Sequence, residues 1–317
     1  MTLTIIHAAA EGTLIEGASR GDGSAEALKA NGWRWSRALG SWYVPHSRDR
    51  EPKTAIINRT AEQLTAAGFI VEISIDYARR PAATVEADLL DRRSDRAAAL
   101  EARAGRRQQD ATEEAERAAR ALRRLPEGGE PIKVGHHSEA GHRRAIARAD
   151  AAVRRSIDAD EAARRAQVRA DIAAAANDAR YAPIAVANRI EKLRADRAGL
   201  RRRLDGSSRT LPGGRVETTT AATGAYAERL ERELVTTDDQ ITYWQEVRAE
   251  QISTGAATDH SKETISVGDQ VKYFGNWCTV TRTNTKSVTI VDAYGHRGTV
   301  LYTHIREHRA GQSGVSS

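Results

Sequence analysis

The chain has 317 residues and a formal net charge of +6; 29% of its residues are charged and only 5% are aromatic. This length allows two or three domains, and the scarcity of large apolar side chains excludes one large core. The single cysteine, Cys278, excludes a disulfide framework and a multi-cysteine zinc site. No run approaches the roughly 18 apolar residues of a membrane span, and the first residues lack a secretion signal. We therefore expect a cytoplasmic protein without a membrane partner.

Residues 1–80 predict a small, tryptophan-rich mixed α/β domain. Short apolar runs at 3–7 and 13–15 are typical of strands, and 60–67 is typical of a helix that ends at Gly68. The segment "FIVEISID" closes the domain as a strand, and its period of two places four apolar residues on one face: Phe69, Val71, Ile73 and Ile75.

The segment "GWRWSRALGSWYV" alternates aromatic and polar residues on both sides of a turn at 39–41, which predicts a β-hairpin. The alternation places Trp33 and Trp35 on the face opposite Arg34. Together with Trp42 and Tyr43, these tryptophans form the core of the small domain, offer a stacking platform for nucleic-acid bases, or do both, with one face in the core and the other as a binding surface. In the second interpretation, nearby cations supply the phosphate contacts: Arg34, Arg37, His46, Arg48 and Arg50.

The middle of the chain is rich in Ala, Arg and Glu, which favour helix. Residues 81–130 predict a long polar helix, from about 86 to 124, followed by a linker. Residues 131–254 predict a central helical domain: a helix from Ser138 to about Arg180, a break at Pro183, a helix at 184–204, a loop at 205–214 and a helix at 218–252. Apolar positions are sparse in the first of these helices: Ile146, Val153, Ile157, Val168 and Ile172. Clean heptads are not sustained, so we expect a helical hairpin or bundle, with dimerisation through the long helices left open.

Residues 264–308 alternate in short strands separated by Gly, Asn and Asp turns, which predicts a small SH3-like β-barrel. Tyr273 and Trp277 are expected in its core, and Cys278 is expected to be a buried thiol. The predicted fold class is α+β: a small N-terminal α/β domain, a central helical hairpin or bundle, and a C-terminal SH3-like β-barrel. Such a barrel does not by itself specify a function.

The segment "VGHHSEAGHRR" at 134–144 carries three of the nine histidines of the chain. Gly135 permits a tight turn, Ser138 is suited to cap a helix, and Glu139 suits the positive end of its dipole. Backbone amides at a helix start bind anions, and nearby cations favour phosphate. The segment therefore predicts a site for a nucleotide or a nucleic-acid phosphate, or else a purely structural cap. The residues of this site are Lys133, Gly135, Ser138, Arg143 and Arg144.

The same histidines also allow a catalytic interpretation. The spacing H-x-E matches half of a zinc deaminase motif, but the other half needs cysteines that the chain lacks. The spacing H-x-E-x-x-H likewise differs from the H-E-x-x-H of zinc proteases. What remains is a cysteine-free acid–base centre, with a divalent metal ion as its expected cofactor. Its catalytic residues are His136, His137, Glu139 and His142, and its metal ligands are His137, Glu139 and His142.

The pattern G-x-P-I-x-V-G-H-H-S-E-x-x-H-R-R, which runs from Gly129 to Arg144, resembles the core of an uncharacterised bacterial domain family found on plasmids, phages and integrative elements. The tryptophan-rich segment before it and the strand-rich segment after it look like modules that accompany this domain. The resemblance implies a mobile-element protein that handles DNA or blunts a host defence, and it implies no reaction.

Three hypotheses follow for the function. The first is a nucleic-acid-binding accessory protein, with DNA favoured over RNA or a nucleotide, that contacts phosphate at 133–144 and bases near Trp33, Trp35 and Trp42. The second is a metal-dependent nuclease or nucleotide hydrolase that uses the histidine cluster. The third is a scaffold that binds a host defence protein through the helical arm.

Overall fold

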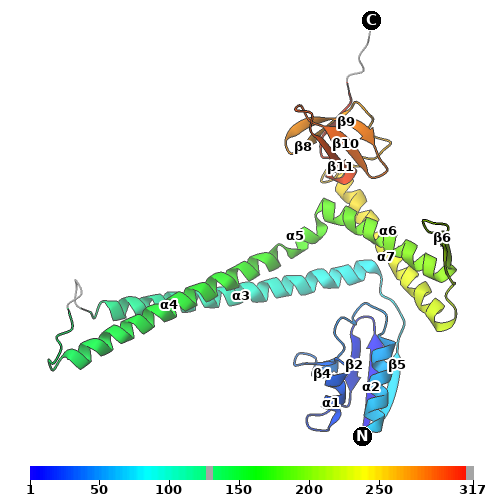
Figure 1. Cartoon of the computed structure of the whole chain (residues 1–317). Helices are drawn as coiled ribbons and strands as arrows, with labels where there is room; N and C mark the ends of the chain where they lie inside the picture. Colours follow the sequence, from blue (N-terminus) through cyan, green and yellow to red (C-terminus); the bar gives the residue numbers. More distant parts are fainter. Residues whose placement is uncertain (126–130, 312–317) are drawn as a thin grey trace. The chain divides into compact units, whose positions relative to one another are not determined.

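The computed structural model describes residues 1–125 and 131–311 (Figure 1). It confirms a mixed α+β protein with a central helical region and sheets at both ends. The chain divides into two units, Met1–Glu86 with Pro183–Ser317 and Ala87–Ala182. Within the described residues, no helix combines the length and the apolar character that a membrane span requires.

The N-terminal domain packs two helices against a five-stranded sheet of strand order β3-β4-β2-β1-β5. Strand β5 runs parallel to β1, and the other pairs are antiparallel. The core is formed by Leu3, Ile5 and Ile15 of the sheet together with Leu28 and Ile57 of the helices. The elements are β1 (Thr2–Ala8), β2 (Gly12–Glu16), α1 (Ser24–Ala30), β3 (Arg34–Ser36), β4 (Ser41–Tyr43), α2 (Thr54–Ala66) and β5 (Ile70–Ile75).

Only part of the predicted apolar face of strand β5 packs against the core. Phe69, Val71 and Ile75 pack against the core, as expected. Ile73, which the period of two places on the same face, is exposed. Because β5 is the edge strand of the sheet, the helices need not cover its whole length.

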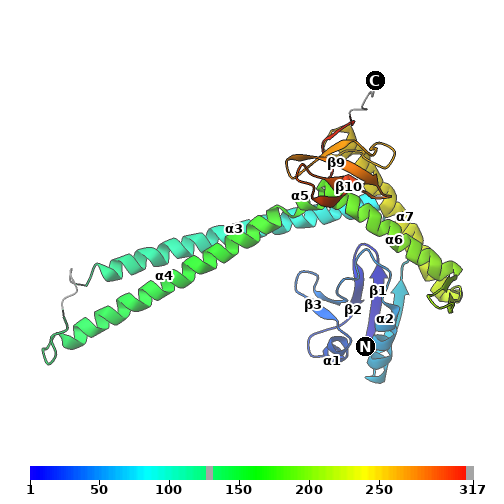
Figure 2. The ribbon, with the colours of Figure 1, turned by 45° about the horizontal axis from the view of Figure 1, so that its top comes forward.

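The second unit is a helical hairpin. Its elements are α3 (Ala82–Leu122), which begins in the first unit, α4 (Glu139–Ala174) and the short α5 (Ala176–Tyr181). Helices α3 and α4 lie side by side in both ribbon views (Figures 1 and 2). Their contacts define an antiparallel pairing, because Asn177 meets Ser94 whereas Arg155 meets Glu114 further along α3.

Small side chains form the seam of this hairpin. Ala104, Ala111 and Ala118 of α3 are buried at intervals of seven residues. Buried alanines also run along α4: Ala149, Ala152, Ala163 and Ala170. The seam therefore follows a heptad of alanines, a pattern that a search for large apolar residues misses. Three of the sparse larger apolar residues of α4, namely Ile157, Val168 and Ile172, are exposed and lie outside this seam.

Helices α6 (Pro183–Asp205) and α7 (Gly224–Ser253) pair through buried residues that include Ile190, Leu230 and Trp244. The predicted break at Pro183 is confirmed, since α6 begins there. The predicted loop at 205–214 and the helix start at 218 are wrong, because 207–219 contains the hairpin of β6 (Ser207–Thr210) and β7 (Val216–Thr219). The β-branched run in β7 explains the difference, since Val and Thr favour strand over helix.

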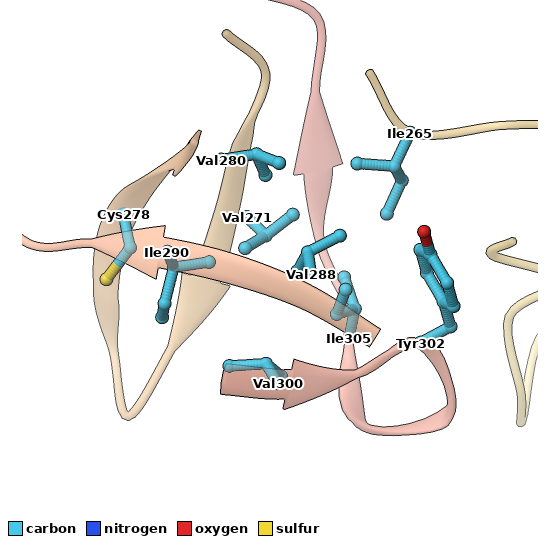
Figure 3. Close-up of a cluster of buried hydrophobic side chains, with 9 residues drawn as sticks. All are labelled: Ile265, Val271, Cys278, Val280, Val288, Ile290, Val300, Tyr302 and Ile305. Atoms are coloured by element: carbon cyan, nitrogen blue, oxygen red, sulfur yellow. The ribbon is translucent and has the colours of Figure 1, made fainter. Parts of the chain in front are cut away.

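The C-terminal module is a five-stranded sheet of order β11-β10-β9-β8-β12. Its buried side chains converge on one face, where Val271, Val280, Val288 and Ile290 meet (Figure 3). The described residues show no closed barrel, so the SH3-like assignment is not confirmed. The elements are β8 (Gln270–Tyr273), β9 (Asn276–Thr283), β10 (Ser287–Val291), β11 (Arg297–Leu301), the 3₁₀ turn η1 (Tyr302–His304) and β12 (His308–Arg309).

Tyr273, Trp277 and Cys278 of this module differ in how deeply they are buried. Tyr273 packs against the core, and Cys278 is buried, so both predictions are confirmed. Burial also raises the pKa of the Cys278 thiol. Trp277 is only half-buried and stands outside the core cluster. The Arg309 guanidinium lies 4.1 Å from its ring centroid, so this tryptophan packs against a cation rather than in the core.

His260, which precedes the C-terminal sheet, lies beside His308 of strand β12. The rings of His260 and His308 are 5.5 Å apart, and His308 Nε2 lies 2.8 Å from a carboxylate oxygen of Asp269. Burial lowers the pKa of His260 below its ordinary value, and the positive charge of His308 lowers it further. Burial raises the pKa of Asp269, but the N–H groups of Ser266 and Gly311, together with His308, outweigh this effect and hold the pKa below its ordinary value.

We expect this module to lose stability as the pH falls below about 6.5, the unfolded value for histidine. The folded pKa of His260 is depressed, so the unfolded chain binds more protons in that window and is favoured by acid. Asp269 cannot cause this loss, because its pKa lies below 3.8. Hydrogen exchange of residues 265–309 at pH 7.5, 6.0 and 5.0 measures the effect. His260→Gln should flatten the pH dependence and the exposed His296→Gln should not; an unchanged profile for His260→Gln would contradict the assignment.

Candidate functional site

The histidine-rich segment precedes α4, and Ser138 occupies the N-cap position of that helix, as predicted. Gly129, the first residue of the motif, lies outside the described residues. Gly135 adopts a positive φ of 79°, a conformation that favours glycine. His136, His137 and Ser138 are exposed, whereas His142 is half-buried. The segment therefore presents its polar groups to solvent.

The capping contacts differ from the predicted ones. The Ser138 side chain makes no capping hydrogen bond; its hydroxyl lies 2.7 Å from Nδ1 of His136. Instead, the Gly135 N–H donates to Glu139 Oε2 at 2.7 Å, and Arg143 Nε donates to Glu139 Oε1 at 2.9 Å. The Gly135 N–H and Arg143 together lower the pKa of Glu139. The turn is thus held by a carboxylate rather than by a serine hydroxyl.

These contacts occupy groups that were predicted to bind a phosphate. The Glu139 carboxylate already binds the Gly135 N–H and the Arg143 side chain, two of the groups predicted to hold a phosphate. Lys133 is exposed but engaged in a further interaction, and Arg144 is exposed. A phosphate at this helix start would have to displace the Glu139 carboxylate.

The structure gives no preformed metal centre here. Throughout residues 1–125 and 131–311, no three His, Cys, Asp or Glu side chains are arranged to hold a metal ion. His136 and His137 do lie together, with ring centroids 4.0 Å apart. The ligand set His137, Glu139 and His142 remains a prediction from spacing.

The three tryptophans near the N-terminus have different environments. Trp33 is 2% exposed, and its Nε1 donates to the Thr60 hydroxyl at 2.9 Å. Trp35 is 48% exposed and lies directly across from Trp42 in the β3–β4 pairing. Trp33 thus belongs to the core while Trp35 faces solvent, so the expectation that they share a face is wrong. The reason is that Trp33 precedes β3, and the alternation begins only at Arg34.

Trp35 and Trp42 form an edge-to-face pair, and one cation lies near it. Their ring centroids are 5.8 Å apart. Lys29, at the end of α1, places its Nζ 6.0 Å from the Trp42 centroid, and Arg34 and Arg37 are exposed in the same hairpin. We call Lys29, Arg34, Trp35, Arg37 and Trp42 the tryptophan patch. The sequence did not identify Lys29, since only the sheet brings α1 beside the hairpin.

The structure also contains a cavity of about 630 Å³, which the sequence did not predict. It lies within the first unit and draws residues from distant parts of the chain, including His7, Asp49 and Asp239. Several of its charged groups pair with one another: Arg80 with Asp49 at 3.2 Å, and Arg79 with Asp239 at 3.6 Å. Because these charges satisfy each other, we assign the cavity no ligand.

The fold and these sites define a modular protein in which a helical hairpin is combined with two small sheet domains. Residues 88–208 match a family described as a domain of unknown function, DUF3560, so the chain contains a DUF3560 domain there. This supports the resemblance of the helical region to an uncharacterised family, but not its mobile-element context or the specific histidine motif. No curated protein and no solved structure matches the chain.

Proposed function

We propose that the protein is a nucleic-acid-binding accessory protein of a phage, plasmid or integrative element, and that DNA is its ligand. The observation that carries this proposal is the tryptophan patch, in which the solvent-facing Trp35 pairs with the half-buried Trp42, Lys29 lies near the Trp42 ring, and Arg34 and Arg37 are exposed in the same hairpin. A contiguous exposed aromatic surface marks an interaction site. The ligand that suits this surface has flat, apolar faces and regularly spaced negative charges.

Single-stranded nucleic acid fits this chemistry. Bases stack on aromatic rings without regard to sequence, and arginine and lysine follow the phosphate backbone. Trp35 is the stacking surface, because it is more exposed than Trp42. Lys29, Arg34 and Arg37 contact about three phosphates. In this proposal the 133–144 segment adds a weaker phosphate contact, through Arg143 and Arg144, after the Glu139 carboxylate moves away.

We also propose that the C-terminal sheet is an SH3-like module that accompanies the binding domain. Strands β8 to β11 form a consecutive meander, and β12 returns after η1 to pair with β8. This order supports the proposal, since small barrels are built from such meanders.

The decisive experiment is a salt titration of DNA affinity. We expect the full chain to bind a fluorescein-labelled 20-nucleotide single strand, with a slope of log K against log[salt] of about −2 or steeper. The three phosphates at the tryptophan patch contribute about −0.7 each, and the contact at 133–144 adds to this. Fluorescence anisotropy at 50 to 300 mM NaCl measures the slope. Weaker binding of the matched duplex is expected, because paired bases cannot stack on Trp35. Absence of binding at 50 mM NaCl would refute the function.

A second candidate function is a nuclease or nucleotide hydrolase. The observation that favours it is the 2.7 Å contact between His136 Nδ1 and the Ser138 hydroxyl, a nucleophile–base pairing beside His137 and Glu139. The test compares the wild type with His137→Ala/Glu139→Ala on single-stranded DNA, duplex DNA and nucleotides, with Mg²⁺, Mn²⁺ or Zn²⁺ added. Product formed only by the wild type would establish the enzyme, and an inactive wild type would end this candidate.

A further inference from the structure

Arginines from both helices gather in the middle of the α3–α4 hairpin, away from the histidine-rich segment. The two helices leave a cleft of about 200 Å³ between them. Each liquid water occupies about 30 Å³, so this space holds several waters or one phosphate group. Its lining residues are Leu100, Arg103 and Arg107 from α3 and Ala162, Arg165, Ala166 and Arg169 from α4. We call this the arginine cleft.

The charge at the cleft differs from the charge elsewhere along the same seam. Closer to the connection between the two helices, Glu114 of α3 lies 3.5 Å from Arg155 of α4, and the two form an opposite-charge pair. At the cleft, both helices contribute arginines and neither contributes a carboxylate to the lining. Like charges that face each other between helices are destabilising. The cleft is therefore a place where the hairpin would gain stability from a bound anion.

Nearby carboxylates neutralise only part of this charge. Arg107 pairs with Asp110 at 3.4 Å, and Arg165 pairs with Glu161 at 3.1 Å; both pairs are exposed. In the part of the chain that the structure describes, Arg103 and Arg169 make no ion pair. Four guanidinium groups thus stand against two carboxylates, and two of the four have donors free for a ligand.

We propose that the arginine cleft binds a phosphate group of a nucleic-acid backbone. Guanidinium groups present a fork of N–H donors that matches two phosphate oxygens at once. Leu100, Ala162 and Ala166 supply the apolar part of the lining, and charged hydrogen bonds are stronger beside apolar groups than in open water. The choice of a nucleic acid rests on the proposed function, whereas the preference for phosphate rests on the cleft alone.

The test uses the full chain and two variants that lose the same charge. Arg103→Gln/Arg169→Gln removes the two unpaired arginines of the cleft. Arg106→Gln/Arg148→Gln removes one exposed arginine from each of the same helices outside the cleft. Affinity for the labelled single strand is measured against salt, and helix melting at 222 nm is measured with and without sodium tripolyphosphate.

We expect the cleft variant to bind DNA about tenfold more weakly than the control variant, with a salt slope shallower by about one phosphate contact. Tripolyphosphate should raise the melting temperature of the wild type and the control, but not that of the cleft variant. Equal behaviour of the two variants would overturn the proposal, since the effect would then be one of overall charge.

Two further results separate the possible failures. If the wild type binds DNA and the cleft variant binds equally well, the cleft proposal fails while the proposed function stands. If no form of the protein binds DNA but tripolyphosphate still stabilises the wild type through the cleft arginines, the proposed function fails. The nucleic-acid ligand is then also overturned, and the cleft takes a free polyphosphate instead.

Discussion

Trp35→Ala is expected to lower the affinity for single-stranded DNA about tenfold or more while leaving the protein folded. Base stacking on an aromatic side chain contributes about 1–3 kcal/mol, and about 1.4 kcal/mol corresponds to a factor of ten. The side chain is 48% exposed, so its removal costs little core burial. The loss of the edge-to-face contact with Trp42 should reduce the free energy of unfolding by no more than about 1 kcal/mol.

Anisotropy titrations with the labelled single strand measure this prediction, and urea unfolding reports the stability. Tyr294→Ala is a matched control, because Tyr294 is another strongly exposed aromatic residue but lies in the C-terminal module. Trp35→Phe should retain most of the affinity, since phenylalanine still offers a stacking face. Unchanged affinity of Trp35→Ala would remove the tryptophan patch from the binding surface.

Trp33→Ala should instead unfold the N-terminal domain or come close to doing so. Replacing a buried aromatic residue by alanine costs about 3–5 kcal/mol, a large share of the stability of a small domain. Trp33 is 2% exposed and packs in the core with Leu3, Leu28 and Ile57. Its removal also deprives the buried Thr60 hydroxyl of a donor.

Urea unfolding followed by far-UV circular dichroism, with hydrogen exchange of residues 1–75, measures the loss. Trp33→Phe should cost less, because it keeps most of the apolar volume and loses only the Nε1 donor. If Trp33→Ala kept the wild-type unfolding midpoint but lost DNA affinity, Trp33 would be a contact residue rather than a core residue.

The contrast between Trp33 and Trp35 shows that a local sequence pattern predicts a hairpin but does not predict which of its aromatic rings is buried. The period of two correctly predicted a β-hairpin, because strand geometry sends alternate side chains to opposite faces. It could not show that the strand begins at Arg34, one residue after Trp33. That boundary decides which ring is buried. It depends on where α2 presents Thr60 to Trp33, a contact between residues 27 positions apart.

The helical hairpin shows a similar division. Composition predicted long helices, and Pro183 predicted where the second pair begins. The seam of alanines was not predicted, because alanine is abundant throughout these helices and its spacing of seven residues does not stand out in the sequence. The arginine cleft was beyond sequence reasoning, since the register of α3 against α4 decides whether Arg103 and Arg169 face a carboxylate or each other.

The sequence by itself determined the α+β class, the glycine turn at Gly135, the position of Ser138 at the start of α4 and the burial of Cys278. These features depend on backbone preference and on residue type, which act over a few residues. Tertiary structure alone decided that Lys29 lies near Trp42 and that four arginines of α3 and α4 line one cleft. A side chain contacts the groups that the fold brings close to it, and these groups are often distant from it in the sequence.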